Sequence, residues 1–215
     1  MSEISALDFV DVPAGPYDLG FRWRDHLPVA AREALEEFLP WEELMIRFSA
    51  ARTVKLPGFA VATTTVSAED LLAHLDEDDD RHLICLDDLC AALDQSLATH
   101  GLRLASEDEL EAACGGTIFP WGDELPDGVP WGDQSTFKRH KLPNALGLQL
   151  NDNPYQVETV AGAFKLGDGG EAVCGGYTWP VAWLSFCPSY RLAGEWVEDL
   201  LSEFLEEARV RPVRR

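Results

Sequence analysis

The stretch from residue 116 to residue 188 constrains this chain more than any other feature. It is dense in Gly, Pro, Trp, Asn and Asp, and its apolar runs are short. Glycine and proline interrupt regular helices and strands, and Asn and Asp favour turns. We therefore predict loops held together by a few short strands and buried aromatic side chains. Functional residues are often found in loops of this kind.

Apolar residues recur at helical spacing in the more regular parts of the chain. Between residues 28 and 48 they predict two helical pieces interrupted by Pro40, and they predict a further helix over 86–99. Ser67 and Ser106 each stand three residues before an acid, which is the pattern of a capping box at a helix start. We therefore expect helices to begin at both serines.

Alternating apolar and β-branched residues predict strands near both chain ends. Residues 9–20 fit a short strand that enters turns, and residues 53–65 fit a strand that leads into a helix. Residues 195–208 present one apolar helical face, and residues 208–214 fit a closing strand. Pro212 cannot donate a backbone hydrogen bond, and it therefore argues for an edge position in the sheet.

The charge balance restricts the partners of the protein. The chain has 17 Lys and Arg against 38 Asp and Glu, a formal net charge of −21. This charge would repel phosphate backbones and anionic membranes, so that we expect neither as a partner. The apolar runs fall short of the ~20 residues that cross a bilayer, and the acidic N-terminus does not resemble a signal peptide. We expect a cytoplasmic protein that binds a protein, a peptide or a small molecule.

Several common site chemistries are excluded by the sequence. The phosphate-binding glycine motifs, the serine-hydrolase elbow and the EF-hand loop are absent, and no two histidines stand at helical pair spacing. The number of cysteines is odd, and the chain is large enough to fold without disulfide bonds. We therefore expect most of the cysteines to be free thiols. The cysteines are Cys85, Cys90, Cys114, Cys174 and Cys187.

One group of polar residues has the donors that a hard cation prefers. It supplies four oxygen donors within eight residues, which suits Ca²⁺ in kind, and consists of Asn151, Asp152, Asn153 and Glu158. The same residue types also build Asx turns, so that both interpretations stay open. Gly167–Glu171 is most simply a tight turn, and the acidic run at 76–80 is most simply a solvated loop.

The segment 174–191 is the most informative part of the loop region. Its aromatic residues and its one arginine could line a ligand pocket, for which the candidates are Tyr177, Trp179, Trp183 and Arg191. Arg191 could then hold an anion, or it could serve as a buried structural partner. The same composition also fits a plain aromatic core.

Five motifs together resemble the formylglycine-generating enzyme (sulfatase-modifying factor) domain family. They are Pro-Ala-Gly-Pro-Tyr-Asp-Leu-Gly at 13–20, the run from Arg103 to Gly116, Phe-Pro-Trp-Gly-Asp at 119–123, Asn-Ala-Leu-Gly-Leu at 144–148 and Cys-Gly-Gly-Tyr-Thr-Trp at 174–179. The resemblance implies an α+β, C-type-lectin-like fold, rich in loops, with short strands and a few helices. It also implies a single domain over residues 1–215, in which 28–48 is a local helical insertion.

The resemblance fails at the catalytic metal. Active members of the family hold copper(I) between two cysteines five residues apart. The sequence around Cys187 resembles that around the second of these two cysteines. At the position of the first cysteine, however, the chain has Ala182 or Pro180, depending on the alignment. Because one thiolate cannot replace a pair at a copper(I) site, we expect no copper site and no formylglycine-generating activity. The family's calcium positions would correspond to Asn153 and Glu158.

We therefore expect a pseudoenzyme that acts as a binding or interaction module. The alternative is a metal-assisted oxidoreductase of altered chemistry, in a biosynthetic or maturation pathway, with Cys187 as its ligand or nucleophile. That role requires a lowered thiol pKa, and Arg191 is the nearby cation in the sequence. A structural subunit of a larger assembly is a third interpretation.

Overall fold

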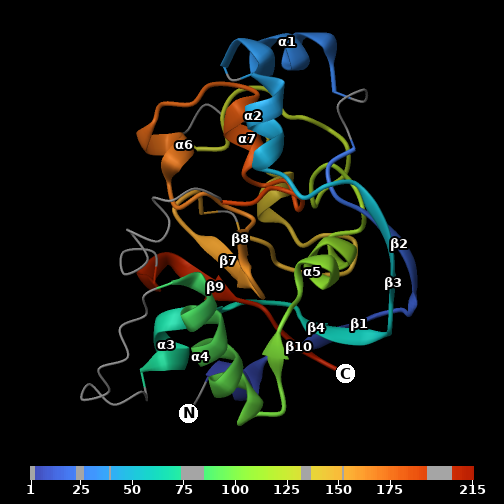
Figure 1. The fold of residues 1–215 in the computed structure, drawn as a ribbon, viewed down its shortest axis with the longest axis vertical. Coiled ribbons are helices and arrows are strands. Elements are labelled where there is room, and N and C mark those ends of the chain that lie inside the picture. Colours follow the sequence, from blue (N-terminus) through green and yellow to red (C-terminus); the bar gives the residue numbers. More distant parts are fainter. Residues whose placement is uncertain are drawn as a thin grey trace.

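A computed structural model describes residues 3–22, 27–38, 40–73, 85–131, 137–151, 153–192 and 205–215. Within these residues the chain forms a mixed α+β structure with short strands in three small sheets and several short helices (Figure 1). The expected α+β class is confirmed. The acidic run at 76–80 and most of the helix expected at 195–208 lie outside the described residues.

The first sheet joins the two ends of the chain. Its order is β1 (Phe9–Val12), β4 (Phe59–Ala62), β10 (Pro212–Arg214) and β6 (Arg103–Leu104), and every neighbouring pair is antiparallel. β1 and β10 lie on either side of β4, in the lower half of Figure 1. All four residues of β4 are buried, as expected for a strand between two others.

The expected edge position of the C-terminal strand is wrong. β10 lies between β4 and β6, and β9 (Ala208–Val210) belongs to another sheet, so that the strand expected over 208–214 is divided in two. Pro212 is tolerated inside the sheet because it is the first residue of β10, a position where no ladder N–H is required. The division falls at Arg211, whose side chain is buried.

The other two sheets are equally small. β2 (Gly15–Leu19) pairs antiparallel with β3 (Arg52–Leu56) in a two-stranded ribbon. The third sheet has the order β5 (Val66–Ser67), β9, β7 (Val157–Val160) and β8 (Ala163–Lys165), in which β7 and β9 run parallel. The strand expected over 53–65 is therefore also divided, since Pro57 and Gly58 separate β3 from β4.

The bounds of the helices are α1 Val29–Phe38, α2 Trp41–Ile46, α3 Ala68–Leu72, α4 Leu86–Ala98, α5 Glu107–Ala113, α6 Glu171–Cys174 and α7 Val181–Leu184, with 3₁₀ turns at Glu3–Ala6 and Arg139–Lys141. The helices α1 to α5 begin where the sequence predicts, whereas the short helices α6 and α7 lie in the region predicted to form only loops and short strands. The Ser67 side chain accepts a hydrogen bond from the Asp70 N–H, and Ser106 forms a complete capping box with Glu109. Pro40 separates α1 from α2, as expected.

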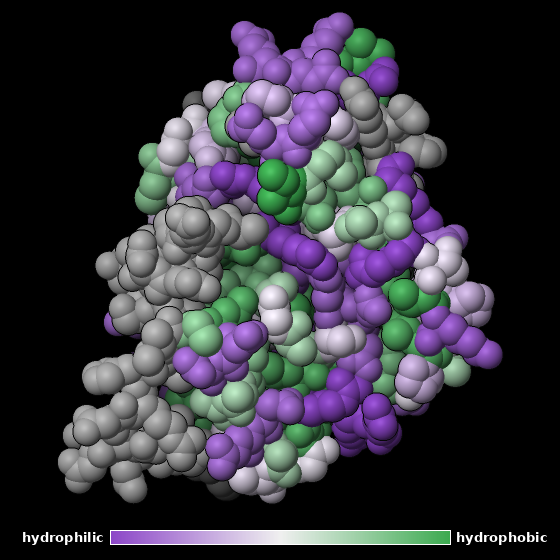
Figure 2. Space-filling model, viewed as in Figure 1, coloured by the Kyte–Doolittle hydropathy of each residue, from purple (hydrophilic) through white to green (hydrophobic). Residues whose placement is uncertain are grey.

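Helices α1 and α2 pack against the loop region. Ala31 and Leu35 from α1 and Leu44 from α2 share one hydrophobic core with α7 and the residues that follow it. Figure 2 shows hydrophilic side chains over α1 at the top of the molecule, where the helix turns its other face to solvent. Residues 181–190 are consequently all buried. No helix in the described ranges is both long enough and apolar enough to cross a membrane.

Candidate functional site

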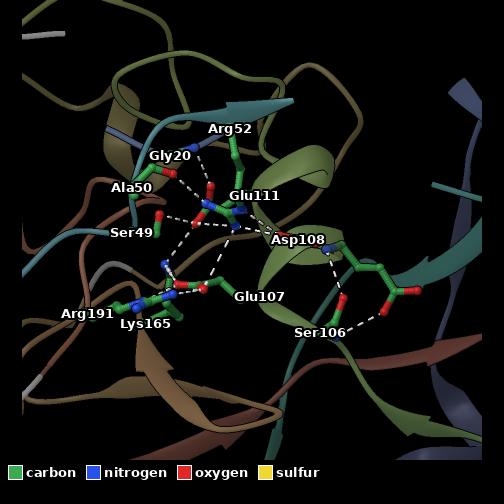
Figure 3. Close-up of polar contacts among 11 residues, drawn as sticks. Gly20, Ser49, Ala50, Arg52, Ser106, Glu107, Asp108, Glu111, Lys165 and Arg191 are labelled. Carbon is green, nitrogen blue, oxygen red and sulfur yellow. Dashed lines mark hydrogen bonds and ion pairs between the residues drawn. The ribbon is translucent and has the colours of Figure 1, made fainter. Parts of the chain in front are cut away.

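A buried ionic network surrounds α5, the helix that begins at Ser106 (Figure 3). Lys165 on β8 has a fully buried side chain, and its Nζ lies 2.6 Å from Glu107 Oε1 and 3.1 Å from Glu111 Oε1. Arg52 on β3 reaches Asp108 at 2.5 Å and Glu111 at 3.4 Å. Three acids on one helix therefore meet cations from separate elements of the chain.

Glu111 also satisfies polar groups outside α5. Its Oε2 accepts a hydrogen bond from the Gly20 N–H at 2.7 Å, and its Oε1 accepts one from the Ser49 hydroxyl at 2.6 Å. Burial by itself would raise the pKa of Glu107, but hydrogen bonds from Arg191 and Lys165 overcome this effect and hold the pKa at about 2. Each buried charge in this network is paired with an opposite charge, and the network connects α5 to several other parts of the chain. We call it the structural joint.

Arg191, a candidate pocket residue, belongs to this joint. Its guanidinium forms two hydrogen bonds to the Glu107 carboxylate. This ion pair is the kind of contact that the structural role predicts, although the Arg191 side chain is 41% exposed rather than buried. This pairing directs the charge of Arg191 toward α5.

Cys187 lies in the interior of the core that α1 and α2 cover. Its side chain has no solvent exposure, and its Sγ lies 3.0 Å from the Ser189 hydroxyl. Burial raises the pKa of this thiol to about 11, so that it stays protonated at neutral pH. Cys174, at the end of α6, is exposed, and Ala182 is a buried residue of α7. All five cysteines are free thiols, as expected. These residues do not fit a copper(I) site.

The three aromatic pocket candidates have internal partners for their polar atoms. The indole N–H groups of Trp179 and Trp183 donate to the carbonyl oxygens of Pro126 and Gly128, each at 2.8 Å. The Tyr177 hydroxyl donates to Glu171 at 2.6 Å. The indoles therefore hold the loop at 126–128 in place, as expected for anchored core tryptophans.

Tyr177 lines a small cavity with mixed apolar and polar walls that sequence reasoning missed. The cavity measures about 10 Å³, space for a single water, and residues of α1, α2 and α7 line it. Arg47 forms two hydrogen bonds to Glu171, at 2.7 and 3.0 Å, and a third to the Tyr190 hydroxyl at 3.2 Å. The buried Ser185 hydroxyl has no hydrogen-bond partner. The only local sequence signal for this cavity was the turn at Gly167–Glu171.

Asp168 contributes a carboxylate to the wall of this cavity, beside Arg47, Tyr177 and Tyr190. Its carboxylate accepts hydrogen bonds from the N–H groups of Gly170 and Ala172, both at 3.1 Å, at the start of α6. Burial nevertheless raises its pKa to about 6. Asp168 is therefore expected to change charge within the mildly acidic range.

The candidate calcium ligands are engaged by the protein itself. Asn151 Oδ1 accepts from the Asn153 N–H at 2.9 Å, and Asn153 Oδ1 accepts from the Tyr155 N–H at 3.0 Å, which is the Asx-turn arrangement. Glu158 is fully buried and takes two hydrogen bonds from Arg211, at 2.7 and 2.9 Å. Asp152 lies outside the described residues.

These oxygens do not fit a calcium ion, because Glu158 could bind calcium only if its hydrogen bonds to Arg211 were broken. In the part of the chain that the structure describes, there is also no group of three or more His, Cys, Asp or Glu side chains arranged to hold a metal. The turn interpretation accounts for Asn151 and Asn153 completely.

A larger groove opens elsewhere on the surface, beside the loop that follows α5. Its volume is about 370 Å³, within the range of small-molecule sites. The walls include Thr117, Trp121, Arg139, Leu142 and Asn144. None of the sequence-derived pocket candidates lines this groove.

Together, the described residues form an α+β structure with a buried ionic network around α5, an enclosed Cys187 and an open groove beside the loop after α5. No protein-family model matches the chain, and no curated protein matches it significantly.

Proposed function

We propose that this protein is a diverged, non-catalytic formylglycine-generating-enzyme-like domain that acts as a binding module. Support for the scaffold comes from the motif between Arg103 and Gly116, which contributes β6, the complete capping box and the acids of α5. In this proposal the three small sheets and the long loops are a variant of the C-type-lectin-like fold. Such folds keep a framework while their loops, and hence their functions, vary.

The environment of Cys187 is the observation that carries the proposal. Copper(I) chemistry requires a pair of accessible thiolates. Here the thiol is completely buried, is bonded to Ser189, and has a pKa of about 11. The position five residues earlier is the buried Ala182. Each of these features favours a core role for Cys187 over a reactive one.

The alternative, an oxidoreductase that uses Cys187, receives less support. It needs a cation that stabilises the thiolate, and Arg191 directs its guanidinium to Glu107 instead. Binding is the remaining role for which the loop region has suitable surface. The net charge of −21 favours a basic protein or peptide, or a small molecule, over nucleic acid.

A copper(I) titration combined with a thiol-peptide oxidation assay tests the proposal. We expect no stoichiometric copper binding and no aldehyde product from the full chain. The matched variants Cys187→Ser and Cys174→Ser should behave like the parent in both measurements. Stoichiometric copper binding with aldehyde formation, lost in Cys187→Ser, would overturn the proposal and restore an enzymatic role.

A further inference from the structure

The groove beside α5 has apolar walls that are held in place. The Trp121 ring stacks on Phe119 with a centroid distance of 4.8 Å and an interplanar angle of 3°. Its indole N–H donates to the Glu124 carbonyl oxygen at 3.0 Å. Leu142 contributes to the groove and is 60% exposed. A fixed aromatic ring near an exposed leucine suits the apolar body of a small ligand.

Arg139 gives the groove its charge. It is the one charged residue among the lining residues that the structure describes. Its Nη2 donates to the Trp121 carbonyl oxygen at 2.9 Å, which orients the guanidinium at the groove. In a chain with a net charge of −21, the described lining carries an arginine and no acid, and Glu124 pairs with the arginine from outside the lining.

The current partner of Arg139 is easily exchanged. Its Nη1 lies 3.1 Å from Glu124 Oε2, and the two side chains are 58% and 59% exposed. Ion pairs with this exposure contribute about 0–1 kcal/mol. A ligand carboxylate in the groove could therefore replace Glu124 on the guanidinium at small cost, and it would gain the planar geometry that arginine offers to carboxylates.

We propose that this groove binds a small organic anion, a carboxylate with a flat apolar body. Arg139 takes the carboxylate, and Trp121 and Leu142 contact the body. The inference deepens the proposed function, on which it rests, by naming the ligand class of the binding module. The acidic remainder of the surface disfavours larger polyanions, which would extend beyond the groove.

Titration calorimetry with three probes of similar shape tests the charge requirement. Indole-3-acetate is the anion, 3-methylindole the neutral analogue and tryptamine the cation. We expect binding of the anion to be at least about tenfold tighter than binding of either analogue, as one charge-assisted hydrogen bond requires. Phenylacetate and benzoate serve as smaller anions. If none of the three anions binds, or if the three indoles bind equally, the proposal is wrong.

Three variants test the assigned residues with opposite expected signs. Arg139→Gln should weaken indole-3-acetate binding about tenfold or more, whereas Glu124→Gln should strengthen it a few-fold because it removes the competing carboxylate. Lys141→Gln is the matched control, since it removes the same charge two residues away from outside the lining set. It should change binding by less than about twofold.

Circular dichroism spectra establish that each variant is folded. If Arg139→Gln and Lys141→Gln weaken indole-3-acetate binding equally, or if Glu124→Gln fails to strengthen it, general charge attraction causes the binding. Either result would overturn the assignment of Arg139 as the residue that binds the carboxylate. The measurements use copper-free protein. Loss of groove binding therefore refutes this inference alone, while the copper and aldehyde assays decide the proposed function separately.

Discussion

The pair formed by Arg211 and Glu158 is expected to be one of the most sensitive points of the fold. Their side chains are 1% and 0% exposed. Arg211 also donates to the carbonyl oxygens of Ala62 and Gln149, at 2.9 and 2.7 Å. The arginine thus connects β4, β7 and the loop before β7. The variant Arg211→Met replaces the guanidinium with an apolar side chain of similar length and so removes all of these donors.

We expect Arg211→Met to lower the free energy of unfolding by about 3–5 kcal/mol, because it leaves the buried Glu158 carboxylate without its counter-charge. For a protein of this size, the melting temperature should then fall by roughly 6–20 °C. The double variant Arg211→Met/Glu158→Leu should recover about 2 kcal/mol or more, because the uncompensated charge is gone. Urea unfolding followed by tryptophan fluorescence measures all three values.

The exposed pair Arg139–Glu124 supplies the matched control. Arg139→Met should lower the free energy of unfolding by less than about 1 kcal/mol, since the side chains of Arg139 and Glu124 are both more than half exposed. Calcium added to the parent protein should leave the melting temperature unchanged, because Glu158 is committed to Arg211. The reasoning would be refuted if Arg211→Met lowered the free energy of unfolding by less than about 1 kcal/mol. It would also be refuted if the effects of Arg211→Met and Glu158→Leu simply added in the double variant.

Three further predictions concern other buried groups. Lys165→Met should lower the free energy of unfolding by about 3–5 kcal/mol in urea, since two glutamates lose a buried partner; an effect under 1 kcal/mol would contradict the structural joint. Burial raises the Asp168 pKa from 3.8 to about 6, so the native state binds this proton more tightly and the parent loses stability as pH rises through that window. The stability of Asp168→Asn relative to the parent should therefore increase by up to about 3 kcal/mol between pH 4 and pH 7, and a flat difference would exclude the shift. Iodoacetamide at pH 7.5, with peptide mass mapping, should label the exposed Cys174 and spare the buried Cys187; labelling of both in native protein would contradict the enclosed thiol.

The candidate site was only partly accessible to sequence reasoning. The segment 174–191 was recognised as aromatic and informative, and its tryptophans are core anchors whose indoles hold a distant loop. The cavity around Asp168 and the groove around Arg139 were not foreseen. The cavity depends on residues far apart in the chain, since Arg47 and its partner Glu171 are separated by 124 positions, and the groove joins the segments 114–122 and 139–145. No local pattern marks such a pair.

Local chemistry explains what the sequence by itself determined: the α+β class, the free thiols, the helix starts at Ser67 and Ser106, and the break at Pro40. Caps and proline breaks act over a few residues, so that their outcome is written in adjacent positions. Only the tertiary structure decided that Pro212 begins an interior strand and that Glu158 faces Arg211. Strand order and buried ion pairing depend on which distant segments come together, because a buried charge is stable only where its partner arrives.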